Sequence, residues 1–156
     1  MEDKDIAKVY DLLRQKHNLS EYEQIDKIFE ISSIESPEFL LRKIRRKIIE
    51  KLRAYIDVLE DLIHPNATVS ALHECNYFNE QEKKKISDIY SRLMSYVRLS
   101  DILDIQLDEA KDAEFIKKIL SDWESTKHDL ISIFKTLQSS WTEKEVADKS
   151  ILAYFG

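Results

Sequence analysis

The chain has 156 residues, of which 43% are hydrophobic and 35% are charged, and its single glycine is the last residue, Gly156. The rest of the sequence therefore lacks the residue that phosphate-binding loops, dinucleotide-binding fingerprints and nucleophile elbows normally require. Tight β-hairpins are disfavoured for the same reason. The formal net charge of −6 argues against a protein that coats nucleic acid over its whole surface. We expect an all-helical protein, and the length fits one domain.

The single cysteine, Cys75, cannot form an internal disulfide, which fits a reducing compartment. The first residues, Met-Glu-Asp-Lys-Asp, are too polar for a signal peptide. No apolar run approaches the roughly 20 residues of a membrane span. We therefore expect a cytoplasmic protein without membrane contact, and we interpret Asn66-Ala67-Thr68 as a helix-start turn rather than a glycosylation site.

The N-terminal part predicts two short helices. Apolar residues recur at helical spacing over about residues 3–17, and Asn18 can end this helix. Ser20 and Glu23 form the pattern of a capping box, which predicts a second helix through about Ile31.

The pair Ser36-Pro37 predicts the start of a longer helix, because serine is a good N-cap and proline is tolerated at the first helical position. The helix should contain about 27 residues and end before Pro65. One apolar stripe runs along it and consists of Leu41, Ile44, Ile48, Leu52, Tyr55, Leu59 and Leu62.

The stretch 65–79 has no regular period and is predicted to be irregular. Asn79 and Glu82 then form a capping box for a helix that reaches about Leu103. Its apolar stripe consists of Ile86, Ile89, Tyr90, Leu93 and Val97.

Asp108 starts the last long helix, whose stripe extends to Trp141. Three long amphipathic helices can cover one another's stripes, so we predict an all-α antiparallel helical bundle over residues 1–141. Residues 142–156 are predicted to form a short helix or a tail.

Basic residues gather in the first half of the helix that is predicted to start at Ser36-Pro37. Between residues 42 and 53 the net charge is +6, so the rest of the chain carries −12. We call this cluster the basic patch, which comprises Arg42, Lys43, Arg45, Arg46, Lys47, Lys51 and Arg53. Arg45 falls within the apolar stripe itself.

Three interpretations of the basic patch remain open. Acids elsewhere in the chain, such as Asp101, Asp104 or Asp112, can pair with these arginines inside the fold. Alternatively, the patch binds an acidic protein partner. It can also make weak contact with a nucleic-acid backbone, mainly through Arg42, Arg46, Lys47 and Arg53, and such binding would depend steeply on salt.

Apolar residues in the C-terminal segment do not follow a helical period. Ile151 precedes Tyr154 and Phe155 by three and four positions, and this spacing resembles the sliding-clamp-binding peptide, or PIP box, of replication and repair proteins. The usual glutamine of that peptide would fall at Asp148. The alternative is a tail that folds back onto the bundle.

Four segments carry a second resemblance and lie at residues 10–14, 20–29, 44–55 and 78–83, the last followed by Ile89, Tyr90 and Leu93. Their order resembles the helical A domain of GINS subunits over about the first 97 residues. The resemblance implies a non-enzymatic scaffold in the replicative helicase assembly. GINS subunits usually add a small β-rich domain, whereas residues 108–141 predict a long helix here.

Residue types that bind metals or perform catalysis are sparse. His64, His73 and Cys75 could supply three ligands, but zinc normally takes four, so we expect no metal and no other cofactor.

We expect no catalytic residue and a scaffold subunit that forms a homo- or hetero-oligomer, with the sliding clamp or helicase components as candidate partners. A nucleic-acid-binding regulator and a bundle enzyme or ligand carrier are the alternatives.

Overall fold

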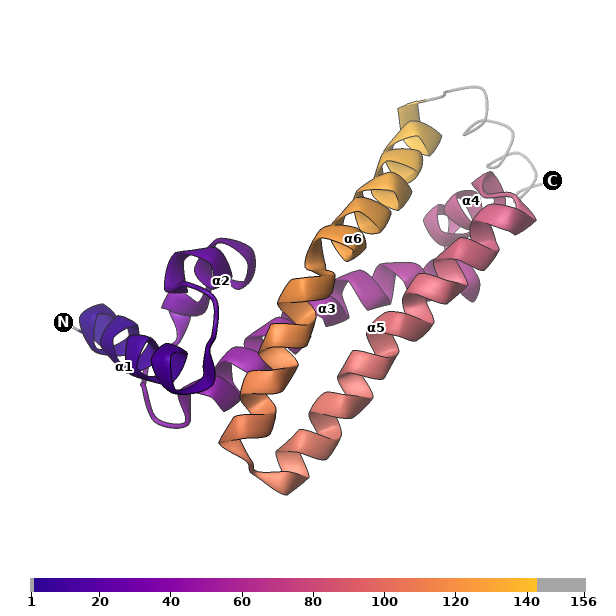
Figure 1. Cartoon of the computed structure of the whole chain (residues 1–156). Helices are drawn as coiled ribbons and strands as arrows, with labels where there is room; N and C mark the ends of the chain where they lie inside the picture. The colour runs from indigo at the N-terminus through magenta and orange to yellow at the C-terminus, as the bar shows by residue number, and fades with distance from the viewer. Residues whose placement is uncertain (1, 143–156) are drawn as a thin grey trace. The chain divides into compact units, whose positions relative to one another are not determined.

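The computed structural model describes residues 2–142, with side chains from Asp5 onward. This part of the chain is all helical and contains no strand, which confirms the predicted fold class. Three of its helices are long. The elements are α1 (Glu2–His17), α2 (Tyr22–Phe29), the 3-10 turn η1 (Ile31–Ser33), α3 (Leu40–Ile63), α4 (Val69–Tyr77), α5 (Glu80–Gln106) and α6 (Glu109–Thr142) (Figure 1).

The chain forms two compact units, and each is described by itself. Unit 1 consists of Met1–Arg53 with Ser95–Glu124, and unit 2 consists of Ala54–Met94 with Ser125–Gly156. The three long helices contribute residues to both units. The predicted C-terminal helix or tail lies, from residue 143 onward, outside the described residues.

In unit 1, α1 and α2 pack together and α2 is fixed to two of the long helices. The Tyr10 hydroxyl donates to the Ser20 carbonyl at the start of the α2 segment. Phe29 packs edge to face against Trp123 of α6, with ring centroids 5.3 Å apart. Lys51 of α3 donates to the Ile28 carbonyl. The C-terminal end of α2 is therefore fixed to both α3 and α6.

In unit 2, α4 fixes the end of α6. The carbonyl of Ser140 accepts a hydrogen bond of 2.9 Å from His73 Nε2. The ring of His73 stacks on Trp141 at 4.3 Å, and Trp141 donates to Glu74 at 3.0 Å. Because a carbonyl only accepts, Nε2 of His73 carries a proton.

Three predicted helix features are wrong. The predicted irregular stretch contains α4, capped by Thr68, whose hydroxyl accepts from the Ala71 N–H. The predicted cap at Ser20 is absent: α2 begins at Tyr22 with Glu21 as its N-cap residue, and the Ser20 carbonyl accepts from the Tyr10 hydroxyl.

The third error is the start of α3. The helix begins at Leu40 rather than at Ser36-Pro37, because Glu38 and Phe39 form a turn in which Phe39 is left-handed. A left-handed residue interrupts the right-handed helix, so the helix can start only after it.

Other predicted boundaries are confirmed. Asn79 and Glu82 make the two reciprocal hydrogen bonds of a capping box, at 2.8 and 3.1 Å. The Asp108 carboxylate accepts from two N–H groups in the first turn of α6. The Asn66 side chain accepts from the Thr68 N–H, which confirms the helix-start turn.

Left-handed backbone occurs at four residues in the described chain, and none of them is glycine. They are Asn18, Glu30, Phe39 and Leu107, with φ between 51° and 55°. Asparagine tolerates this conformation, but the others carry a cost of about 1–2 kcal/mol each. Asn18 ends α1 as predicted, whereas the sequence pattern did not reveal the other three.

Candidate interaction site

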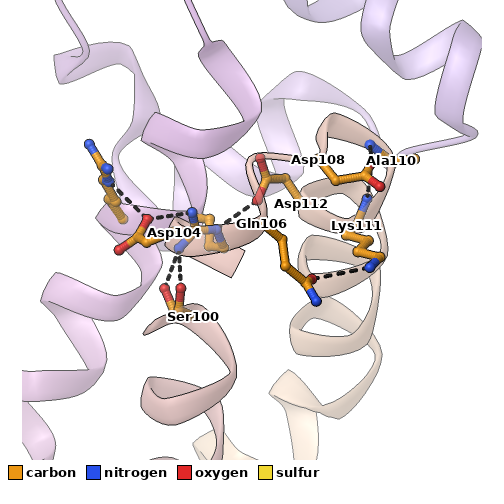
Figure 2. Close-up of polar contacts among 9 residues, drawn as sticks. Ser100, Asp104, Gln106, Asp108, Ala110, Lys111 and Asp112 are labelled. Carbon is orange, nitrogen blue, oxygen red and sulfur yellow. Dashed lines mark hydrogen bonds and ion pairs between the residues drawn. The ribbon is translucent and has the colours of Figure 1, made fainter. Parts of the chain in front are cut away.

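The guanidinium of Arg45 is fully buried in unit 1 and bonded by four groups. Its Nε donates to Asp112 at 2.8 Å, and its Nη2 donates to Asp104 at 2.6 Å. Its Nη1 donates to both the carbonyl and the hydroxyl of Ser100. In Figure 2 the side chains of Ser100, Asp104 and Asp112 converge on this guanidinium. Arg45 of α3 thereby joins α5 to α6.

The internal-pairing interpretation of the basic patch therefore applies to Arg45. Asp104 and Asp112 are two of the three acids named for this role, whereas Asp101 pairs with Arg98 at 2.9 Å instead. A buried cation is stable only when it is paired and hydrogen-bonded, and these contacts meet that condition.

The two carboxylates respond differently to this environment. Burial raises the pKa of Asp112, and the hydrogen bond from Arg45 opposes the rise only in part. Burial also acts on Asp104, but hydrogen bonds and charge from Arg45, together with Arg46, lower its pKa. Asp104 is 38% exposed, whereas only 5% of the Asp112 side chain is exposed, which explains the difference.

Most other residues of the basic patch also have partners within unit 1. Arg46 lies 3.3 Å from Asp104, Lys43 donates to the Ser36 carbonyl at 3.0 Å, and Lys47 lies 3.7 Å from Glu50. Lys51 binds the Ile28 carbonyl. The guanidinium of Arg42 lies over the Phe39 ring at 4.7 Å, and Arg53 is exposed.

Large apolar side chains are exposed around the α5–α6 turn of unit 1. Ile105 is 82% exposed, Leu107 58% and Ile102 50%, and Phe39, just before α3, is 68% exposed. We call these four residues the turn patch. Large apolar groups contribute to stability mainly when they are covered, so these four exposed residues make this surface a candidate interaction site.

The turn patch borders two hollows in unit 1. One, which we call the α5–α6 hollow, measures about 300 Å³ and is lined by Leu99, Ile102, Leu103, Gln106, Lys111, Glu114, Phe115 and Lys118. The other measures about 200 Å³ and has Phe39 and Leu107 on its walls, with Arg42, Glu109 and Asp112 beside them.

The turn patch was not among the sites predicted from the sequence. Ile102 and Ile105 are three residues apart, so they look like a continuation of the core stripe of α5. At 100° per residue, however, Ile102 lies about 140° around the helix axis from Val97 and therefore on another face. That change of face was the available signal. The sequence carries no signal for the exposure of Phe39 and Leu107, because outside a helix or strand no periodicity distinguishes an exposed apolar residue from a buried one.

The remaining predictions concern the C-terminal partner-binding residues, metal binding and membrane contact. Ile151, Tyr154 and Phe155 lie outside the described residues. Among residues 2–142, His, Cys, Asp and Glu form no group of three placed to hold a metal ion. Within the same range no helix combines the length and apolarity needed to cross a membrane.

No protein-family model, curated protein or solved structure matches the chain.

Replacing Arg45 by methionine should lower the free energy of unfolding by about 3–5 kcal/mol, because the Asp112 carboxylate would stay buried without its cation. Urea denaturation measures the change. Arg46→Met is the matched control, since Arg46 shares Asp104 but is exposed, and it should cost less than about 1 kcal/mol. An equally small effect of both substitutions would contradict a structural role for the Arg45 contacts.

Acid should weaken unit 1 through Glu109 of α6. Hydrogen bonds from His17 and Lys16 lower the pKa of Glu109, although burial opposes them. A lowered folded-state pKa gives stability that is present above the unfolded pKa and is lost as the pH falls through the folded pKa. Denaturation midpoints between pH 6 and 3 should therefore fall less steeply in Glu109→Gln than in wild type. The control, Glu114→Gln on the same helix, should keep the wild-type slope; a wild-type slope in Glu109→Gln would contradict the assignment.

Proposed function

We propose that the chain is a non-enzymatic interaction subunit that joins a larger protein assembly through the turn patch. The observation that carries this proposal is the combination of exposure and backbone cost at Phe39 and Leu107. Both residues are left-handed, both are more than half exposed, and both line the same hollow.

Within the chain, Phe39 gains a contact with the Arg42 guanidinium, whereas the Leu107 side chain is 58% exposed. Glycine or asparagine would adopt this backbone conformation at a lower free-energy cost. The phenylalanine and leucine side chains are mostly exposed, so they contribute little hydrophobic free energy to folding. Strained residues that the fold itself does not require often belong to functional surfaces. A protein partner that covers the patch would supply the missing burial.

The sharpest version of this function is membership of a DNA replication assembly. It is supported by the resemblance of the first 97 residues to GINS subunits and of Ile151, Tyr154 and Phe155 to a clamp-binding peptide. In this version the turn patch contacts other subunits of the assembly and the C-terminal segment contacts the sliding clamp.

Nucleic-acid binding is a second candidate, favoured by the exposure of Arg46 and Arg53. The internal partners of Arg45, Lys43, Lys47 and Lys51 leave few cations to neutralise phosphates. This candidate therefore implies weak binding with a shallow dependence on salt.

Leu107→Asn should preserve or raise the free energy of unfolding, because asparagine tolerates the left-handed backbone, yet it should weaken binding to purified helicase components at least 10-fold. The matched control is Glu30→Asn, which relieves the same backbone conformation in unit 1 outside the patch and should bind as wild type. In parallel, an Ile151/Tyr154/Phe155 triple alanine variant should lose the purified sliding clamp. Equal recovery of each partner by wild type and the corresponding variant would contradict the proposal.

A further inference from the structure

We propose that Ser36 is a phosphorylation site and that its phosphate is held in a cationic hollow between α3 and the loop before it. The phosphoryl donor is a nucleoside triphosphate, used by a protein kinase. The inference goes beyond the proposed function and does not depend on the turn patch, because every residue that it uses lies between positions 33 and 50 of unit 1.

The hollow that receives the phosphate, which we call the loop hollow, measures about 360 Å³. It is lined by Ile34, Glu35 and Ser36 of the loop and by Lys43, Arg46, Lys47 and Glu50 of α3. The α3 residues are three or four positions apart in sequence and share one face of the helix. The three cations outnumber the two acids, so the loop hollow carries a net positive charge and favours an anionic group.

Ser36 is placed for modification by its own segment. Residues 34–37 form neither helix nor strand, and Ser36 is partly exposed. A residue before proline is held in an extended conformation, and no other serine or threonine in the chain precedes a proline. Proline has no N–H, so a kinase that recognises this pair needs no acceptor at the second position. The pair Ser36-Pro37 therefore presents an accessible hydroxyl on extended backbone.

Lys43 already lies at Ser36. Its Nζ donates to the Ser36 carbonyl at 3.0 Å, and an ammonium has two further N–H donors for a phosphate on the same residue. The Ser36 hydroxyl itself accepts only a long contact of 3.4 Å from the Glu38 N–H. Little internal bonding is therefore lost when the hydroxyl becomes a phosphate ester.

Lys47 and Arg46 complete the cationic wall. Lys47 lies one turn along α3 from Lys43, and its contact with Glu50 is 3.7 Å long, with the Glu50 side chain 74% exposed. Such an exposed pair contributes little, so a phosphate dianion can replace it. Arg46 is 57% exposed and donates to Asp104 from Nε at 3.3 Å. All three cations are thus accessible from the loop hollow.

A phosphate on Ser36 needs fewer cations than a bound nucleic acid does. The covalent bond keeps it at high effective concentration beside Lys43, so modest ion pairs are enough to hold it. The first turn of α3 contains no acid, and a phosphate just before this helix supplies the negative charge that a helix N-terminus favours. The phosphate therefore fixes the loop to α3.

The covalent step is a phosphoryl transfer. The Ser36 Oγ forms a bond to the γ-phosphorus of the nucleoside triphosphate, and the bond from that phosphorus to the β-phosphate oxygen breaks. The nucleoside diphosphate leaves, and the hydroxyl proton passes to the kinase and then to solvent. The product carries about −1.5 to −2 charge at pH 7 and three acceptor oxygens.

Phosphorylation of the full chain tests the acceptor. With magnesium and ATP, a proline-directed serine kinase should place one phosphate on Ser36, located by mass spectrometry, and Ser36→Ala should lose it. Pro37→Ala should slow the labelling at least 10-fold, whereas Ser33 of the same loop region should stay unmodified. An unlabelled Ser36, or labelling of Ser33 at the same rate, would overturn the proposal.

Phosphoserine incorporated during translation tests the loop hollow without a kinase. In a phosphorus NMR titration, the second ionisation at position 36 should have its midpoint at least half a pH unit below that at position 33, because nearby cations favour the dianion. Ser33 is the matched control, since its hydroxyl faces the Glu30 carbonyl and does not line the loop hollow. Lys43→Met with Lys47→Met should abolish the difference. Equal midpoints in the otherwise wild-type chains, or a difference that survives both substitutions, would contradict the proposal.

Inorganic phosphate distinguishes a covalent phosphate from a free anion. Calorimetry should show binding to the unmodified chain that is millimolar or weaker, because the free ion lacks the covalent bond to Ser36. Micromolar binding that Ser36→Ala retains would assign the loop hollow to a free anion and overturn the proposal.

Discussion

The buried guanidinium of Arg45 is the interaction on which unit 1 depends. It lies in the apolar stripe of α3, where a cation without partners would be strongly unfavourable. Ser100 and Asp104 of α5 and Asp112 of α6 supply those partners, and they lie on both sides of the turn at Leu107. One side chain therefore fixes three helices at the point where α5 reverses into α6. Such a contact gives a defined arrangement more than net stability, since well-packed apolar groups can be equally stable.

The turn patch depends on the same contact. Leu107 adopts a costly backbone conformation in a two-residue connection, and Asp104 and Asp112 are bound by Arg45 a short distance before and after it. If these acids were free, the turn could relax and the exposed side chains could settle against the core. In the structure Arg45 holds both acids, and Ile105 and Leu107 are exposed. The buried polar contact and the exposed apolar side chains thus lie at the same turn between α5 and α6.

The sequence predicted much of the architecture because helical periodicity and capping are local. The stripes of α3, α5 and α6, the capping box at Asn79 and the start of α6 at Asp108 all follow from neighbouring residues. The sequence also singled out Arg45 as a charge within a stripe, and it named Asp104 and Asp112 among the acids that could pair with it. Which acids do so depends on how α3 meets α5 and α6, and that information is not local.

The start of α3 and the positions of Phe39 and Leu107 were missed for one shared reason, namely left-handed backbone at large apolar residues. Ser36-Pro37 has the composition of a helix start, but the left-handed backbone at Phe39 delays the helix to Leu40. Phenylalanine and leucine give no composition signal for such a conformation, which usually belongs to glycine or asparagine. The absence of glycine before Gly156 excluded glycine-dependent chemistry. It did not exclude left-handed backbone, and the places where the chain adopts it with large apolar residues mark the candidate site.

The central claim, that Arg45 holds the turn which presents the patch, is tested most directly by native-state hydrogen exchange. In the structure the Leu107 N–H donates to the Leu103 carbonyl and the Asp112 N–H to the Asp108 carbonyl, at 3.1 and 3.0 Å. Arg45→Met should reduce the protection of these two amides at least 10-fold relative to the rest of α5 and α6, whereas Arg46→Met should leave it unchanged. Undiminished protection at Leu107 and Asp112 in Arg45→Met would contradict the account.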